Sequence, residues 1–315
     1  MTIIWRLMVF LAVTATTVGM ASAQPAKIRL GYAATTDFAS AFVAAEQGIF
    51  AKHGLDVSFV QLPQAGAAIP ALVSGSLELG SCTPPAFLQA VEGDLDLVGI
   101  TGGSVMTKEV NDFTALVARN GSNIHGGKDL EGKTVGATAL NGTLYILFLE
   151  WLEKSGVDRS KVRIVEIPFP QQLDALRSGQ IDAAIPVDPF LGRIIGENVG
   201  YRVAAYMEAA PQGLSAVFYC GTRSWAAANV ASVAAFRAAI AESVAFIAEN
   251  DGANDAQVRT DISKYVKMPP EVMAKLVISK PDESLTPAHL QGWYDLMRHQ
   301  GSLHAPMTMA QLIAP

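Results

Sequence analysis

LVSGSLELGSCTPPAF (residues 72–87) and LRSGQIDAAIPVDPF (residues 176–190) are two versions of one pattern. Each has Ser-Gly, one further residue, an aliphatic residue, an acid and a short apolar run, and each then enters a loop with proline that ends in Phe. A helix that ends at Ser-Gly and passes into a buried strand explains the first half, because Gly is a common residue after a helix C-terminus. The chain therefore repeats one structural unit.

The repeat extends beyond these two stretches. KIRLGYAATTD (27–37) has a counterpart in KTVGATALNGT (133–143), and GLDVSFVQLPQ (54–64) has one in GVDRSKVRIVEIPFPQ (156–171). The matching glycines are 105, 102 and 104 residues apart, in the same order along the chain. Solenoid repeats have periods of about 20–50 residues, so repeats of this length are whole lobes.

Each copy alternates strands with helices, which predicts the α/β class with two doubly wound βαβ lobes and mostly parallel sheets. Helices are expected over 38–54 and 144–156. Since the turns that follow parallel strands emerge at one edge of a sheet, two facing lobes would line one shared cleft. The expected strands are Ile28–Ala33, Asp56–Gln61, Leu77–Ser81 and Leu95–Ile100 in the first copy, and Thr134–Ala137, Val162–Ile167, Ile181–Pro186 and Tyr201–Ala205 in the second.

After the second copy the pattern changes to one strand (213–222), a long helix (225–250) and helical stretches near 254–266, 270–278 and 287–300. We expect these helices to pack on lobe one. The predicted domains are lobe one at 24–115 and 216–315 and lobe two at 116–215. The chain would cross between the lobes near 112–120 and 206–215, and such a double crossover suits hinge closure.

The first 23 residues have the features of a secretory signal: one cation (Arg6), the apolar run LMVFLAV, and Ala21-Ser22-Ala23 before Gln24. The alternative is an N-terminal membrane anchor. Cleavage near Ala23 would export the protein to the periplasm. Further along, no uninterrupted apolar run approaches the roughly 18–20 residues of a membrane span.

The charge excludes some partners. Without Arg6 the mature chain has 22 basic and 29 acidic side chains, a net charge of −7. Nucleic acid and anionic lipid are therefore poor partners, because no basic stretch is present to bind them.

Several of these motifs together resemble the periplasmic solute-binding proteins of ABC importers, in the branch that captures sulfonates, taurine, nitrate and thiamine-precursor pyrimidines. The resemblance is carried by AAEQGIFAKHGLDVSFV (44–60), ALVSGSLELGSCTPPAFLQA (71–90), DLEGKTVGATALNGT (129–143), LEKSGVDRSKVRIVEIP (152–168) and LRSGQIDAAIPVDPF. It implies a type II periplasmic binding fold, a monomer, no cofactor, and delivery of a small solute to an ABC permease and its ATPase. Two positions depart from the branch: Val187 replaces an aromatic residue, and the second lobe's first helix begins at Asn141-Gly142-Thr143.

The turns at the predicted cleft supply the candidate ligand contacts. In lobe one, Thr35–Phe38 offers hydroxyls and helix N–H groups that attract oxyanions, although Thr36 or Asp37 would equally serve as a helix cap. Asp188 likewise reads as a cap or a ligand contact. The full predicted set is Thr35, Thr36, Asp37, Phe38, Gln64, Gly66, Cys82, Thr83, Asn141, Gly142, Thr143, Phe169 and Asp188.

Catalytic signals are missing from the sequence. The five histidines are scattered without metal-ligand spacing, and no phosphate-binding loop or nucleophile elbow is present. Cys82 is expected to be a buried packing residue, and it should lie roughly 15 Å from Cys220 if their strands are neighbours, which predicts two free thiols. Lys108 and Arg119 are expected on the surface or at the hinge.

The sequence thus predicts an extracytoplasmic solute-binding protein and no enzyme and no metal site. A sulfonate-like ligand suits the Thr-rich turns, and nitrate, a carboxylate or a pyrimidine remains open. If Asp37 and Asp188 face the cleft, they favour a ligand with donors, such as an amine. The alternatives are a ligand-sensing subunit for a membrane receptor and an enzyme on the same scaffold.

Overall fold

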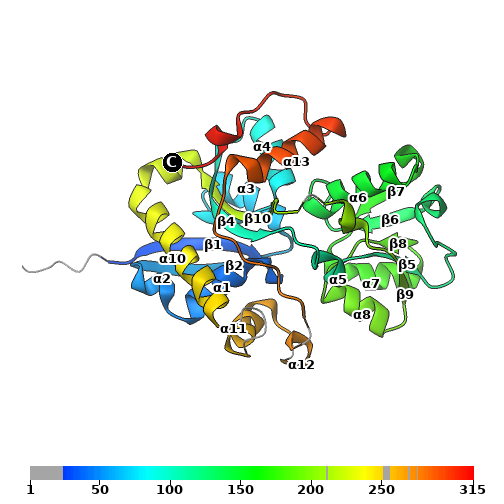
Figure 1. The fold of residues 1–315 in the computed structure, drawn as a ribbon, viewed down its shortest axis with the longest axis horizontal. Coiled ribbons are helices and arrows are strands. Elements are labelled where there is room, and N and C mark those ends of the chain that lie inside the picture. The colour runs from blue at the N-terminus through cyan, green and yellow to red at the C-terminus, as the bar shows by residue number, and fades with distance from the viewer. Residues whose placement is uncertain (1–23, 211, 251–255, 269, 275) are drawn as a thin grey trace, which may run out of the picture.

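The computed structural model describes residues 24–210, 212–250, 256–268, 270–274 and 276–315. The predicted signal segment (1–23) lies outside the described residues, as do the first two residues of the predicted helix 254–266. Figure 1 shows two groups of strands side by side along the longest axis of the molecule, with the second group formed by the green segments in the middle of the chain.

The first sheet has the order β2-β1-β3-β10-β4. β1 is parallel to β2 and β3, whereas β10 is antiparallel to both of its neighbours. We call this sheet and the helices packed on it the first lobe. Its strands are β1 (Ala26–Ala33), β2 (Leu55–Leu62), β3 (Leu79–Cys82), β4 (Leu97–Val105) and β10 (Ser215–Thr222), and its helices before β4 are α1 (Ala39–Glu46), α2 (Ile49–Lys52), α3 (Ala68–Val73) and α4 (Pro84–Glu92).

The second sheet has the same design, in the order β7-β6-β8-β5-β9. β6 is parallel to β7 and β8, and β5 is antiparallel to β8 and β9. This sheet and its helices are the second lobe. Its strands are β5 (Leu116–Arg119), β6 (Thr134–Ala137), β7 (Arg163–Glu166), β8 (Ala183–Ala184) and β9 (Gly200–Ala204), and its helices are α5 (Val110–Phe113), α6 (Thr143–Lys154), α7 (Phe169–Ser178) and α8 (Phe190–Gly196).

The predicted α/β architecture with two lobes is confirmed, with one correction. Each sheet contains an antiparallel strand inserted between the third and fourth strands of its repeat. One of them, β5, occupies a stretch that was expected to be a plain crossover, because its place in the sheet depends on pairing with β8 and β9 far along the chain. The chain changes sheets between Val105 and Leu116 and returns between Ala204 and Ser215. The domain limits themselves stay a prediction.

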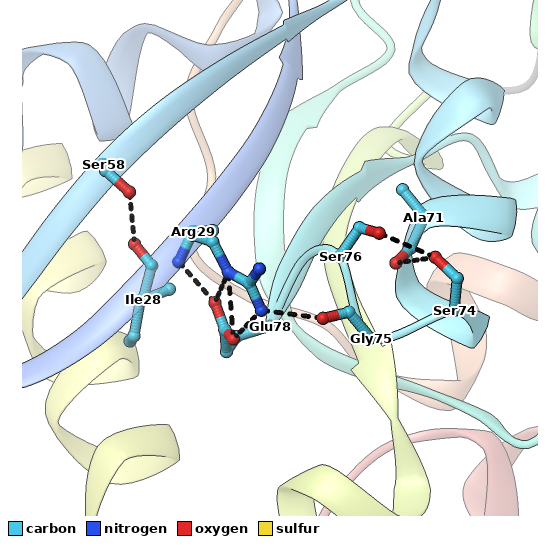
Figure 2. A network of polar contacts seen from close by, with 8 residues as sticks. All are labelled: Ile28, Arg29, Ser58, Ala71, Ser74, Gly75, Ser76 and Glu78. Atoms are coloured by element: carbon cyan, nitrogen blue, oxygen red, sulfur yellow. Dashed lines mark hydrogen bonds and ion pairs between the residues drawn. The ribbon is translucent and has the colours of Figure 1, made fainter.

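The acid of the repeated pattern has the same contact in both lobes. Glu78 accepts a hydrogen bond from the backbone N–H of Arg29 in β1 at 2.7 Å, and its carboxylate also pairs with the Arg29 guanidinium (Figure 2). Asp182 accepts the backbone N–H of Thr134 in β6 at 3.0 Å. Each acid thus ties the first strand of its lobe to the start of the third, which explains why both copies need one at this position.

The aliphatic residue before the acid explains a glycine elsewhere in each copy. A Cβ on Gly31 would lie 2.5 Å from the Leu77 side chain, and one on Gly136 would lie 2.7 Å from Ile181. Leu77 and Ile181 are buried in the core. In both lobes a glycine in the first strand therefore leaves room for the aliphatic side chain that closes the same face of the sheet.

The C-terminal helices are α9 (Arg223–Ala228), α10 (Val230–Glu249), α11 (Ala256–Val266), α12 (Pro270–Met273) and α13 (Pro287–His299). α10 packs on α1 and α2, and α13 packs on α4, as expected for helices of the first lobe. α13 also approaches the second lobe: the buried Gln300 side chain just after it donates to the carbonyl of Ile146 in α6 at 3.1 Å. One apolar cluster accordingly contains residues of both lobes, Phe218 and Phe148 among them.

Three predicted helices differ in detail. The segment 38–54 is divided at Gly48, whose φ of 69° ends the helix and lets α2 start in a new direction. The segment 225–250 is divided into α9 and α10, and 270–278 is reduced to α12. Among the described residues, α10 is long and apolar enough to span a membrane by length and composition. Its buried residues, such as Phe236 and Ile240, pack in the apolar cluster of the first lobe.

The prediction of two free thiols is wrong, because Cys82 and Cys220 form a disulfide with Cα atoms 6.0 Å apart. The prediction assumed that Cys82 ends its strand at the cleft and that Cys220 lies five residues away from the cleft. In fact β10 runs past that end, and Phe218 is the residue that pairs with Cys82. Cys220 is therefore only two positions away, on the same face of the neighbouring strand, which is a distance that a disulfide can bridge.

Removal of the disulfide should destabilise the protein. The bond closes a loop with a sequence separation of 138 residues, and loss of a native disulfide costs about 2–5 kcal/mol of unfolding free energy. The Cys82→Ser/Cys220→Ser variant is expected to lose that amount in urea unfolding. Mass spectrometry of the intact protein should show two hydrogens fewer before reduction than after it, and equal masses would contradict the disulfide.

The Glu78 contact should give a pH-dependent contribution to stability. Burial raises the pKa of Glu78, but hydrogen bonds from the Arg29 side chain and backbone and the guanidinium charge outweigh it, so the pKa lies below its ordinary value of 4.5. A lowered carboxyl pKa stabilises the fold above the unfolded-state value, and this contribution is lost as the pH falls through the lower folded-state value. Glu78→Gln should cost about 1 kcal/mol at pH 7. The difference from the unaltered protein should shrink in acid unfolding curves below pH 4.5, and a difference that grew there would contradict this role.

Candidate functional site

A cavity lies between the lobes, at the edge where the strands of both repeats end. It holds about 810 Å³ of empty space, its open mouth included. The first lobe and β10 contribute one wall, the second lobe the opposite wall, and the crossing segments the floor. The lining residues are Ala33, Thr35, Asp37, Phe38, Gln64, Gly66, Thr83, Met106, Phe113, Thr114, Thr138, Ala139, Asn141, Gly142, Thr143, Leu144, Phe169, Val187, Met207, Ala216 and Val217.

Most of the residues predicted from the sequence are brought together here. Those that line the cavity are Thr35, Asp37, Phe38, Gln64, Gly66, Thr83, Asn141, Gly142, Thr143 and Phe169. They come from the equivalent turns of both repeats, so the predicted convergence of the turns is found in the structure. That these side chains contact a solute stays a prediction.

Three predicted residues do not line the cavity. Thr36 is buried under the C-terminal segment, where its hydroxyl accepts the backbone N–H of Ser279 at 3.2 Å. Cys82 is buried in the disulfide. Asp188 points into its own helix start, where it accepts the backbone N–H of Gly192 at 2.8 Å, so it acts as a cap of α8.

Opposing effects act on the pKa of the Asp188 carboxyl near the cleft. Burial raises the pKa of Asp188, against the opposing effects of the Gly192 N–H and the Arg202 charge. The group is held by one backbone hydrogen bond and is half-buried. Its place outside the cavity lining follows from the short loop that carries it directly into α8.

Residues of the crossing segments were missed by sequence reasoning. Met106, Phe113 and Thr114 follow β4, and Met207 belongs to the short helix Tyr206–Ala209 before β10. The sequence pattern predicted these segments only as connections between the lobes. Their position between the two sheets was the signal available, because a segment that joins two facing lobes must border the space between them.

Asp37 is held in place by two hydroxyl groups. Its Oδ2 accepts from the Thr35 hydroxyl at 2.9 Å, and its Oδ1 accepts from the Ser104 hydroxyl of β4 at 3.3 Å. A carboxylate accepts about four hydrogen bonds. These two contacts therefore orient Asp37 and leave lone pairs on both oxygens for a further donor.

Thr143 lies on the opposite wall and links the lobes. It is the first residue of α6, and its hydroxyl donates to the carbonyl of Ala216 in β10 at 3.4 Å. The side chain is buried at the meeting point of the two lobes. A small change in the separation of the lobes would alter this contact.

Several polar groups of the cavity wall have no hydrogen-bond partner among the described residues. The amide oxygen of Gln64 and the hydroxyls of Thr83 and Thr138 are buried and unpaired. Buried polar groups are normally satisfied, because an unpaired one costs about 1–3 kcal/mol. Their grouping around one cavity indicates a site built for a polar guest or for water.

The lining contains no Lys, Arg or His in the described part of the chain. Lys108 is exposed, and Arg119 pairs with Asp182 at 3.6 Å, so neither faces the cavity. The described residues also contain no group of three or more His, Cys, Asp or Glu side chains that would hold a metal ion. Asp37 is therefore a carboxylate without a positive side chain beside it in the cavity.

The fold and the cavity agree with the family to which this chain belongs. Residues 21–262 match the model of the NMT1-like family. Since the match covers more than half of the chain, the protein is a member of that family.

Two curated relatives share only part of their length with this chain. It is 25% identical over 193 residues to the nitrate import ATP-binding protein NrtC of Synechocystis sp., covering 57% of this chain and 29% of that protein. It is 24% identical over 218 residues to the bicarbonate-binding protein CmpA of Synechococcus sp., covering 60% of this chain and 47% of that protein. The chain thus spans half or less of the length of these relatives.

The fold is also that of a solved binding protein. The alkanesulfonate-binding protein SsuA from Xanthomonas axonopodis pv. citri, solved with MOPS bound, superposes with a TM-score of 0.75. The superposition covers 93% of this chain and 99% of SsuA, at 19% sequence identity. At that identity the likeness establishes the fold and not the ligand.

Proposed function

We propose that this protein is an extracytoplasmic solute-binding protein that captures a small polar organic molecule between its lobes and presents it to an ABC permease and its ATPase. The observation that carries the proposal is the single cavity lined by equivalent turns of both repeats. Family membership and the binding proteins among the relatives support it. The similarity to part of an import ATP-binding protein supports an ATPase partner.

The proposed mechanism is closure of two lobes, 24–115 with 216–315 and 116–215, about the two crossing segments. Sheet hydrogen bonds hold each segment at both of its ends, in β4 and β5 for one and in β9 and β10 for the other. Motion is therefore confined to the short stretches between these strands, as in hinge closure. A monomer exported through cleavage near Ala23 fits this role.

Binding in this cavity should stabilise the protein against heat. A thermal-shift screen of sulfonates, carboxylates, nitrate, bicarbonate, pyrimidines and amines tests this, since a ligand at 100 times its Kd adds about 2.7 kcal/mol. Val187→Trp should abolish the shift of any compound that binds, because the ring would fill the half-exposed wall position of Val187. Val60→Trp on the outer face of β2 is the matched control. A shift that survives Val187→Trp would place the ligand elsewhere and contradict the proposal.

Thr143→Ala should lower the affinity for the same ligand by about tenfold, the equivalent of 1.4 kcal/mol. The substitution removes a hydroxyl at the meeting point of the lobes and its bond to Ala216. Isothermal titration calorimetry measures the effect, and Thr143→Ser, which keeps the hydroxyl, should restore the affinity. An unchanged affinity in Thr143→Ala would remove this residue from the site.

A further inference from the structure

We infer that the cavity selects a small organic cation, namely a protonated amine on an apolar, preferably aromatic, body, rather than an oxyanion. This inference rests on the proposed function and specifies its ligand. The geometry that carries it is the combination of an oriented carboxylate, unpaired acceptor groups, helix starts that proline partly deprives of N–H donors, and aromatic walls.

The first-lobe wall contains two groups that only accept, the Asp37 carboxylate and the Gln64 amide oxygen, beside the Thr83 hydroxyl, which can donate or accept. Asp37 is oriented by Thr35 and Ser104 and keeps lone pairs free. The buried amide oxygen of Gln64 has no partner. A guest that satisfies these groups must bring hydrogen-bond donors, and an ammonium group brings three together with a compensating charge, which a neutral hydroxyl lacks. An oxyanion would instead meet a carboxylate and no cationic side chain among the described lining residues.

The helix N-termini at the cavity are poor anion sites. An oxyanion binds at a helix start through free backbone N–H groups, and proline has none. α4 has Pro84 and Pro85 as its first two residues. α7 follows Pro168 and has Pro170 as its second residue, and α8 follows Pro189. The starts of α7 and α8 keep the N–H groups of Phe169 and Phe190, whereas the N–H groups of Gln171, Leu191 and Gly192 already donate to Pro168, Val187 and Asp188. The start of α6, at Thr143, has no proline and lies opposite the Asp37 wall.

The remaining surface suits the apolar body of an organic cation. Phe38, Phe113 and Phe169 line the cavity from the first lobe, the crossing segment and the second lobe. Phe169 is held in a stacked pair with Phe190, with ring centroids 5.4 Å apart. A cation near an aromatic face is attracted by the ring quadrupole. The net negative charge of the whole chain also attracts a cation and repels an anion during encounter.

The test compares three benzyl compounds of similar shape: benzylamine, benzyl alcohol and phenylmethanesulfonate, with nitrate as a small anion. Isothermal titration calorimetry at pH 7 should give the highest affinity for benzylamine, at least about tenfold above the alcohol, because the alcohol leaves the Asp37 carboxylate without a charged partner. Phenylmethanesulfonate and nitrate should not bind. Stronger binding of either anion than of benzylamine would overturn the inference.

Substitutions test whether the Asp37 carboxylate binds the cation. Asp37→Asn keeps the shape of the side chain and should lower the affinity for benzylamine at least about tenfold. Asp56→Asn, which removes the same charge at an exposed position of β2, should leave that affinity unchanged. If Asp37→Asn does not fold, Val187→Lys with Val187→Met as its uncharged control gives a second test. Lys at this position should weaken the binding of benzylamine at least about tenfold more than Met does, because both side chains take up space but only Lys adds a positive charge.

The outcomes separate this inference from the proposed function. Binding of anions that Val187→Trp abolishes, without binding of benzylamine, would leave the solute-binding role intact and reject the cation. No thermal shift with any compound of either class would count against both. Retained benzylamine affinity in Asp37→Asn would reject the carboxylate contact and with it the inference.

Discussion

The structure depends on one topological constraint: each sheet receives an antiparallel strand from a segment that has just crossed between the lobes. β10 enters the first sheet between β3 and β4, and β5 enters the second between β8 and β9. The backbone hydrogen bonds of these strands fix where both crossings begin and end. Because the crossing segments also form the cavity floor, with Met106 and Met207 among the lining residues, any movement of the lobes changes the shape of the site.

The repeat predicted the scaffold well because its residues act through short-range contacts that recur in both copies. The roles of Gly31, Leu77 and Glu78 are repeated by Gly136, Ile181 and Asp182, and the strand at Thr134–Ala137 was predicted with its observed bounds. The disulfide and the strand β5 were missed for a different reason. Both depend on the register between segments far apart in sequence, which no local pattern encodes.

The cavity also has features that the local sequence predicts and features that it does not. The turns of the two repeats could be assigned to it because parallel strands place their following loops at one edge. The direction of each side chain could not be predicted: Thr36 and Asp188 differ from Thr35 and Asp37 only in which neighbour their oxygens contact. Similarity to SsuA does not resolve this point, because proteins that share a fold bind different ligands through different wall residues.

Closure by a ligand requires that the ligand bind the closed arrangement better than the open one. A small anion held by one turn would contact one lobe and shift this equilibrium little. A cation bound to Asp37 on the first lobe can also place its body against Phe169 of the second lobe, and it gains that contact only when the lobes approach. The hydrogen bond from Thr143 to Ala216 acts in the same direction across the cleft. On the proposed function, a molecule with one charged end and one apolar end would contact both walls of this cavity, and its length would set how far the lobes close.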